Sequence, residues 1–315
     1  MRICFRPELI VLLLLIPASA RATTAVEPRR CSVQLTQGQS IEDAIGICNR
    51  QLEDEHLNQS QRAEAYLNRA GLELSRGDKR QALDDLDRAI EIMPDEKSAY
   101  EMRGSLYLSS GNTALAMADL DKAVQLDPNY AEAYNSRGVA LLAAGDYARA
   151  VGDFNIALKL GLASARTYNN RAYAYIYERQ YDAAIADFGA ALSIDGESVL
   201  ALKGRCWARA VTGQQLELAL ADCTKSIEIK PDRPDNVYTH DARGLVDLRL
   251  GKYQDALADY DLAVAGDSKQ ARPLFGRGIA KLRLGDTTGS NADMEAAKKI
   301  DPDIADEFRN YNITP

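Results

Sequence analysis

Histidine and cysteine, two residues that often carry chemistry, are scarce in this sequence. Its 315 residues include two His and five Cys, which leaves little room for imidazole acid–base catalysis or for a metal site with several ligands. No Cys-x-x-Cys pair, Ser/His/Asp set, glycine-rich phosphate loop or paired-carboxylate cleft stands out. The sequence therefore disfavours an enzyme, and it predicts no catalytic residue, no metal site and no cofactor.

The N-terminus has the three-part layout of a secretory signal peptide. Arg2 and Arg6 precede an apolar run at positions 9–16, and Ala18-Ser19-Ala20 follows it. This run is far shorter than the roughly 20 residues that span a bilayer. Cleavage is expected after Ala20, with Ala22 as a second choice, and an uncleaved anchor is the alternative. No later segment could span a membrane, so the mature chain is predicted to lie beyond the inner membrane, in the periplasm.

Four cysteines remain after this segment, and in an oxidising compartment they are disulfide candidates. Cys31 and Cys48 are 17 residues apart, and so are Cys206 and Cys223. The equal spacing predicts two local bridges, and closing such a loop stabilises a fold by about 3 kcal/mol in the chain-entropy model. The alternative is that Cys206 and Cys223 are small buried apolar side chains.

Composition narrows the class of partner. With 46% hydrophobic residues the chain can bury a core, and with 38 Lys plus Arg against 46 Asp plus Glu it is too charged for a membrane protein. A chain with a formal net charge of −8 is not attracted electrostatically to the phosphate backbone of nucleic acids. Nucleic acid is therefore excluded as an expected partner.

An arginine followed by a small residue recurs every 34 residues, at Arg69, Arg103, Arg137 and Arg171, and continues at Arg205, Arg243 and Arg277. Only the step from Arg205 to Arg243 is longer, by four residues. A period of 34 is typical of helix-turn-helix repeats. In the first unit the pattern predicts one helix from 66 to about 76, a turn at 77–78, and a second helix that ends before Pro94.

Positions can be counted within each unit from Ala63, Lys97, Ala131, Ala165, Val199, Val237 and Ala271, with one extra residue in the turn of the fifth unit. Position 8 is small in every unit, position 20 is Ala in all but one, and position 27 is Ala in all but one. Small residues at these places let two helices approach closely. A helix-breaking proline closes four units, at Pro94, Pro128, Pro231 and Pro302.

On these residues the sequence resembles tetratricopeptide repeat proteins of a secreted bacterial type, over about residues 63 to 304. The resemblance implies an all-α fold, an α-solenoid of seven tetratricopeptide helix-turn-helix repeats with an N-terminal capping helix. It also implies that the first helices form the wall that binds partners. The expected organisation is a signal peptide (1–20), an extension (21–39), a capping helix (40–62), repeats (63–96, 97–130, 131–164, 165–198, 199–233, 237–270, 271–304) and a short C-terminal cap (305–315).

Every unit has Arg at position 7 and Asp at position 23. An arginine on the packed side of the first helix needs an acceptor, and a carboxylate from a second helix can supply one bidentately. We therefore expect seven structural pairs that set the register of the repeats. The alternative, a charged ligand track, is weaker because matched opposite charges cancel.

Positions 2, 5, 9, 12 and 13 lie opposite the core stripe of each first helix and form the expected partner-binding wall. In the middle units this wall carries amide, basic and aromatic side chains: Asn135, Arg166, Asn169, Tyr173, Tyr177, Lys203 and Trp207. Aromatic anchors beside polar groups suit a peptide groove. The alternative is that Tyr173 and Trp207 pack between repeats.

The wall lacks the paired Lys and Asn with which some family members hold an acidic C-terminal tail, so a chaperone-tail receptor is not expected. The leading hypothesis is a secreted, periplasmic, non-catalytic scaffold that mediates protein–protein interaction by binding a protein or peptide segment. The alternative is a periplasmic protein that binds a small ligand, such as a glycan or peptide fragment.

Overall fold

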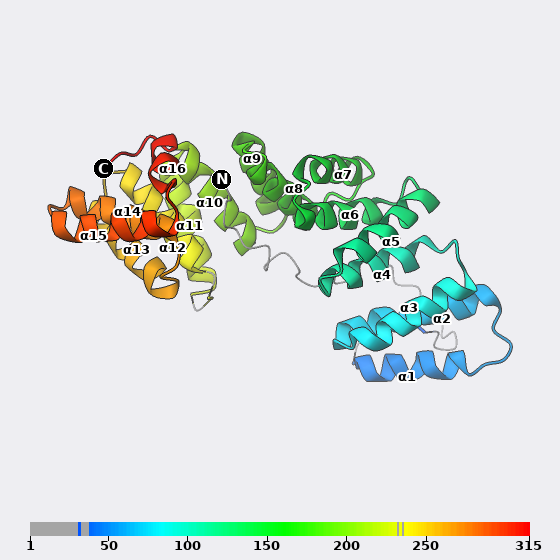
Figure 1. Cartoon of the computed structure of the whole chain (residues 1–315). Coiled ribbons are helices and arrows are strands. Elements are labelled where there is room, and N and C mark those ends of the chain that lie inside the picture. The colour runs from blue at the N-terminus through cyan, green and yellow to red at the C-terminus, as the bar shows by residue number, and fades with distance from the viewer. Residues whose placement is uncertain (1–30, 33–37, 232, 235) are drawn as a thin grey trace. The chain divides into compact units, whose positions relative to one another are not determined.

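The computed structural model describes residues 31–32, 38–231, 233–234 and 236–315. The predicted signal peptide and most of the extension after it lie outside these residues. Every regular element in the described part is a helix, and the sixteen helices confirm the all-α prediction. The described residues form two compact units, one up to Leu162 and one from Ala163 onward, and each is taken by itself below (Figure 1).

The N-terminal unit contains seven helices and the C-terminal unit contains nine. The first seven are α1 (Ile41–Leu52), α2 (Gln59–Arg76), α3 (Lys79–Ile92), α4 (Lys97–Ser109), α5 (Thr113–Leu126), α6 (Ala131–Ala144) and α7 (Tyr147–Lys159). The others are α8 (Ala165–Tyr177), α9 (Tyr181–Ile194), α10 (Val199–Thr212), α11 (Leu216–Ile229), α12 (Asn236–Arg249), α13 (Tyr253–Gly266), α14 (Ala271–Arg283), α15 (Thr287–Ile300) and α16 (Ile304–Asn310).

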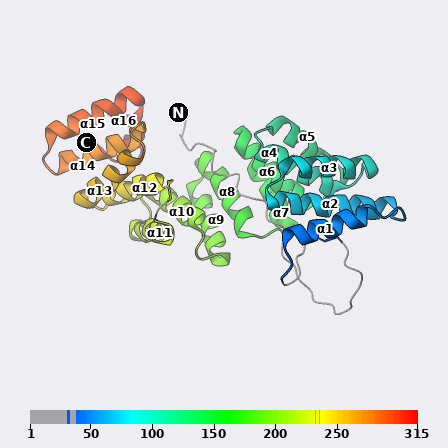
Figure 2. The ribbon, with the colours of Figure 1, turned by 90° about the horizontal axis from the view of Figure 1, so that it is seen from below.

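Helices α2 to α15 form consecutive hairpins, in which each first helix packs on the second helix of its own repeat (Figure 2). The small residue at position 8 makes this packing possible. A Cβ atom added to Gly138 of α6 would lie 2.7 Å from the Phe154 ring of α7, closer than real atoms pack. Successive first helices also touch, α4 on α6 in the N-terminal unit, and α8 on α10, α10 on α12 and α12 on α14 in the C-terminal unit, where they form a continuous layer.

A helix precedes the repeats, as expected, but it is shorter than the predicted 40–62: α1 ends at Leu52, and residues 59–62 already belong to α2. The N-cap of α1, Ser40, accepts a hydrogen bond from the Asp43 backbone, while the Asp43 side chain accepts one from the Ser40 backbone. This capping box satisfies backbone groups that the first turn leaves open. Ala44, Ile45 and Cys48 point into the core beside α2, so α1 covers the apolar face of the first repeat.

The seven Arg–Asp pairs are all present. In each repeat the arginine Nε and Nη2 atoms donate to the two carboxylate oxygens of the position-23 aspartate, at 2.6–2.9 Å. The hydrogen bond to Asp153 raises the pKa of Arg137. Because both partners sit at the same positions in every repeat, the pairs fix the register between the first and second helices.

A third contact of the same arginines links neighbouring repeats, which the sequence analysis did not anticipate. The Nη1 atom of Arg137 donates to Asp121 of the preceding repeat at 2.9 Å, and Arg103 and Arg277 make the equivalent bonds to Asp87 and Asp261. In the sixth repeat Thr224 accepts from Arg243 instead. Each of these guanidinium groups therefore joins three helices.

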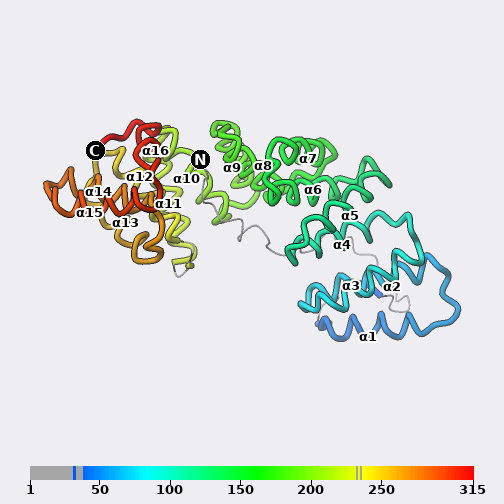
Figure 3. Tube along the Cα trace, in the orientation of Figure 1, coloured from blue at the N-terminus to red at the C-terminus, as the bar shows by residue number. Residues whose placement is uncertain are grey.

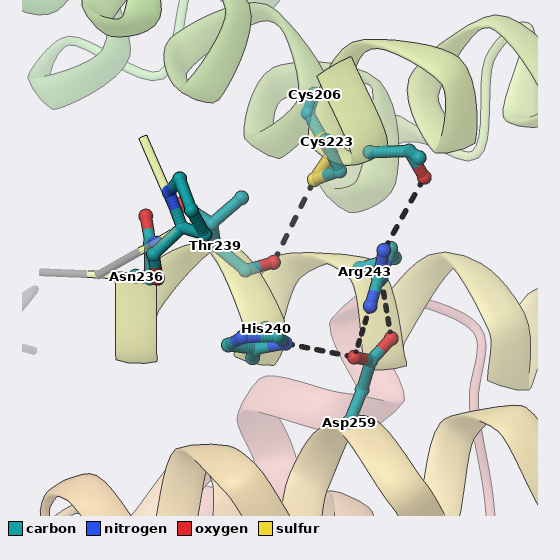
Figure 4. A network of polar contacts seen from close by, with 9 residues as sticks. Cys206, Cys223, Asn236, Thr239, His240, Arg243 and Asp259 are labelled. Atoms are coloured by element: carbon teal, nitrogen blue, oxygen red, sulfur yellow. Dashed lines mark hydrogen bonds and ion pairs between the residues drawn. A yellow bond between two sulfur atoms is a disulfide. The ribbon is translucent and has the colours of Figure 1, made fainter. Parts of the chain in front are cut away.

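Both predicted cysteine pairs are joined. The Cα atoms of Cys31 and Cys48 are 4.5 Å apart, and those of Cys206 and Cys223 are 5.5 Å apart, within the range of disulfides. The second bridge joins α10 to α11 beside a polar network (Figure 4). There Asp259 accepts hydrogen bonds from Arg243 and His240. Burial acts to raise the pKa of Asp259, but these two donors outweigh it and hold that pKa below its usual value.

Position 11 shows an electrostatic conflict in the sixth repeat. In the fifth and seventh repeats this position is basic, and Arg209 and Lys281 pair with the position-23 aspartates. In the sixth repeat it is Asp247, which is 3% exposed. Its Oδ1 atom has no hydrogen-bond partner among the described residues. Burial, together with the charges of Asp259 and Asp255, raises the pKa of Asp247 to about 6.

We therefore expect Asp247→Asn to stabilise the chain at pH 7 by about 1–2 kcal/mol. The unfolded side chain loses its proton near its ordinary pKa and the folded one near pH 6. The wild-type chain should therefore lose stability as the pH rises from about 4 to 6. Thermal unfolding at pH 4 and pH 7 tests this, with Glu228→Gln as an exposed control. An equal gain at both pH values would contradict the ionisation argument.

Candidate functional site

The first-helix wall is the set of side chains at positions 2, 5, 9, 12 and 13 of the first helices. In the C-terminal unit these helices are α8, α10, α12 and α14. Three consecutive contacts, α8 on α10, α10 on α12 and α12 on α14, place them side by side. Equivalent positions on successive helices are therefore neighbours, so the wall offers a row of side chains to an extended partner.

Six of the seven predicted wall residues lie in the C-terminal unit, on α8 and α10. Arg166 is exposed, Tyr177 and Lys203 are half-buried, and Asn169 is buried. The Asn169 amide donates to the Ser198 hydroxyl at 3.3 Å. Tyr173 links the two helices, because its hydroxyl donates to the Leu200 carbonyl at 3.2 Å.

The seventh residue, Asn135, belongs to α6 of the N-terminal unit and is buried. Near it on the same unit, Glu101 of α4 accepts hydrogen bonds from the hydroxyls of Ser105, at 3.0 Å, and Ser136, at 2.5 Å. Burial raises the pKa of Glu101, and these hydrogen bonds act against it. This cluster ties α4 to α6 and is enclosed by the packing of the two helices.

Trp207 is 5% exposed, so its ring is not open on the wall as the sequence analysis expected. The guanidinium of Arg272, from α14, lies 4.1 Å from the centre of the ring. The ring of Tyr311 meets Trp207 edge-on at 6.3 Å. The side chain is therefore covered by residues far along the chain. Whether it binds a partner stays a prediction.

Residues 304–315, here called the tail segment, lie on the first-helix wall. Arg249 of α12 donates to the carbonyl of Tyr311, and Arg283 of α14 donates to the carbonyl of Thr314 at 2.9 Å. Both arginines occupy position 13 of their repeats. Figure 3 shows the trace turning back after α15 toward α12 and α10.

Buried charges lie beneath the tail segment. Asp241, at position 5 of the sixth repeat, is 1% exposed and accepts from the Nε atom of Arg272 at 2.5 Å. Arg272 also lies 3.9 Å from Glu307 of the tail segment. Burial raises the pKa of Asp241, although Arg272 acts against this. The Oδ1 atom of Asp241 has no hydrogen-bond partner among the described residues.

Wall residues of the sixth and seventh repeats were not among the predicted site residues. Asp241, Arg249, Arg272 and Arg283 all occupy wall positions, so the same positional rule, carried two repeats further, would have found them. The sequence predicted a short cap at 305–315 and named no residues that would pack it against the repeats. In the structure Ile304, Phe308 and Tyr311 are all buried, and this pattern with steps of four and three residues was the available signal.

No group of His, Cys, Asp and Glu in the described residues could hold a metal ion. None of the helices in the described part of the chain has the length and apolar character that a membrane crossing requires. The side chains of the wall are rings, guanidinium groups and amides, groups that are common at protein interfaces.

Known families and structures agree with this architecture. Models of the tetratricopeptide repeat match residues 104–145, 165–198 and 242–303. No curated protein sequence matches the chain. Among solved structures, the Cut9–Hcn1 assembly of the APC/C superposes with a TM-score of 0.62 at 13% identity, over 86% of this chain and 52% of that one. The chain thus spans about half the length of that relative.

Two shorter structures also superpose. PilF of Pseudomonas aeruginosa has a TM-score of 0.54 and 21% identity, covering 69% of this chain and 96% of its own. YrrB, described as having an unusual peptide-binding site, has a TM-score of 0.52 and 21% identity, covering 60% of this chain and 95% of its own. Identities this low show a shared fold alone.

Proposed function

Since this chain belongs to the tetratricopeptide repeat proteins, we propose that it is an exported, non-catalytic scaffold that binds a segment of another protein along its first-helix wall. The repeat fold supports a role in protein–protein interaction. One observation supports the proposal that the partner binds along the first-helix wall. Side chains at wall positions of three successive repeats already contact a stretch of polypeptide, the tail segment. YrrB, a protein of similar fold, is described as having a peptide-binding site.

The chemistry of the wall suits a peptide. Position-13 arginines bind main-chain carbonyls, which every peptide offers, while Trp207, with the Arg272 guanidinium over its ring, meets the aromatic side chain of Tyr311. Exposed Arg166 and half-buried Lys203 extend the basic character along α8 and α10. The partner is therefore a protein or peptide segment, and the wall gives it both main-chain and side-chain contacts.

Two features of the chain support the proposal that it is exported. Its first twenty residues have the layout of a signal peptide, and its two disulfides suit an oxidising compartment such as the periplasm. N-terminal sequencing of the protein recovered from a bacterial periplasm tests this proposal. A mature chain beginning at Arg21 or Thr23 supports export, whereas retention of residues 1–20 contradicts cleavage.

A displayed random-peptide library, panned on the purified mature chain, tests binding. We expect a family of related peptides, and we expect Arg166→Glu with Lys203→Glu to weaken their binding at least about tenfold, because charge complementarity at a wall is lost. Lys122→Glu, which reverses the charge of a half-buried lysine on the second helix α5, is the matched control. Failure to enrich any peptide would contradict the proposal and favour a small-ligand binder.

A further inference from the structure

We propose that the tail segment is an internal ligand of the first-helix wall. It occupies the place of a partner, and the partner that replaces it presents an aromatic ring one helical turn after a carboxylate. This inference rests on the proposed function, because it names the chemistry of the segment bound and a contact that regulates binding.

The path of the tail segment is not that of a further repeat. By the 34-residue period α16 falls where a new first helix would begin, and such a helix would pack on the preceding repeat alone. Helix α16 does contact α14 and α15. The residues at its end, however, reach Arg249 on α12 and Trp207 on α10, one and two repeats further back. The segment therefore runs along the wall rather than extending the stack.

Two parts of the tail segment make different contacts, the first with the end of the seventh repeat and the second with the first-helix wall. Ile304 and Phe308 are 1% and 0% exposed, and Phe308 packs 5.0 Å from the ring of Phe275. These two side chains close the apolar end of the seventh repeat. Beyond them, Tyr311 and Thr314 contact the wall through one ring and two main-chain carbonyls.

The specific contacts centre on Tyr311 and Glu307. The Tyr311 hydroxyl donates to the Glu307 carboxylate at 2.5 Å, one turn earlier in α16. The Tyr311 ring meets Trp207, and Arg272 lies between Trp207 and Glu307. An aromatic ring and a carboxylate four residues apart on a helix thus fit a tryptophan–arginine pair. The two position-13 arginines then bind the main chain that follows, whatever its sequence.

The docked state also carries costs that make it displaceable. In the docked state Asp241 is buried and its Oδ1 atom lacks a hydrogen-bond partner among the described residues, and the same holds for the Nε atom of Arg249. Buried polar atoms without partners oppose burial. Helix α16 has seven residues, too few to be stable without its contacts. A competing segment therefore does not have to displace a helix that is stable by itself.

The experiment uses the single Trp as its probe. In the mature full-length chain Trp207 should be shielded from acrylamide. Removing residues 311–315, which keeps Ile304 and Phe308 in place, should raise the quenching constant at least about twofold, because the shielding ring is gone. A synthetic peptide of residues 303–315 should then restore the shielding. Tyr311→Ala in the full-length chain should behave like the deletion, and Asn310→Ala, an exposed neighbour, should behave like wild type.

Affinity provides the second readout. The peptide should bind the 311–315 deletion at least about tenfold more tightly than the full-length chain, because a docked segment leaves only a small open fraction. The same peptide with Tyr311→Ala should not bind the deletion variant. In a deletion variant that also carries Arg249→Ala and Arg283→Ala, the peptide should no longer restore the shielding of Trp207.

Two results would overturn the inference. The first is equal quenching with and without residues 311–315. The second is a deletion that exposes Trp207 but does not bind the peptide, which would make the segment a cap only. Peptides selected from the random library could still bind in either case, so failure of this inference is distinguishable from failure of the proposed function.

Discussion

Arg137→Ala is expected to lower the free energy of unfolding by about 2–4 kcal/mol. Arg137 donates two hydrogen bonds to Asp153, which is buried, and a third to Asp121 of the preceding repeat. Removing the guanidinium leaves the Asp153 carboxylate in a site with little water and without its partner. Unpaired buried charge is costly, so most of the loss comes from the group left behind.

A double-mutant cycle isolates that contribution. Arg137→Ala with Asp153→Ala should cost less than the sum of the two single changes, because the second removes the stranded charge. Arg149→Ala is the control, since its pair with Asp146 has side chains 64% and 41% exposed; such pairs contribute about 0–1 kcal/mol. Urea unfolding followed by circular dichroism gives the energies. Strict additivity would show that the two residues do not act on each other.

The repeats could be predicted from the sequence because the same pattern of residues occurs in all seven of them. Arg at position 7 and Asp at position 23 recur in register, and their pairing follows from the burial of a charge that needs an acceptor. The bond from Arg137 to Asp121 was missed because position 25 varies: Asp in three repeats is replaced by Thr224 in another. A contact between repeats also depends on how they stack, which the sequence of one repeat does not contain.

The covering of Trp207 lies beyond what periodicity can predict. The wall position of Trp207 follows from the repeat, but its burial depends on Arg272 and Tyr311, which are 65 and 104 residues further along the chain. The tail segment occurs once, so no repeated pattern reveals where it lies. Its apolar residues, spaced by four and three positions, predict a helix with one buried face, and only the structure shows which surface that face meets.

Removal of the Cys206–Cys223 bridge is the second change with a large expected effect. The bridge joins α10 to α11, and both cysteines are 0% exposed. Replacing both by alanine opens the cross-link in the unfolded chain, which costs about 3 kcal/mol in the chain-entropy model. The double replacement leaves no unpaired thiol behind, so cavity and redox effects stay small beside the lost constraint.

Hydrogen exchange measured by mass spectrometry localises this loss. Amides of α10 and α11 that exchange only through opening of this hairpin should exchange about 100-fold faster, since each 1.4 kcal/mol is a factor of ten. Amides of α2 and α3, in the other unit, should be unchanged. Cys31→Ala with Cys48→Ala is the matched control: it should accelerate exchange in α1, which carries Cys48, and leave α10 and α11 unchanged. Reductant should accelerate exchange of α10 and α11 in the wild-type chain and have no further effect on them in the Cys206/Cys223 variant. Unchanged exchange in that variant would mean that the hydrogen bonds from Arg205 and Arg209 of α10 to Asp222 of α11, rather than the bridge, hold the hairpin closed.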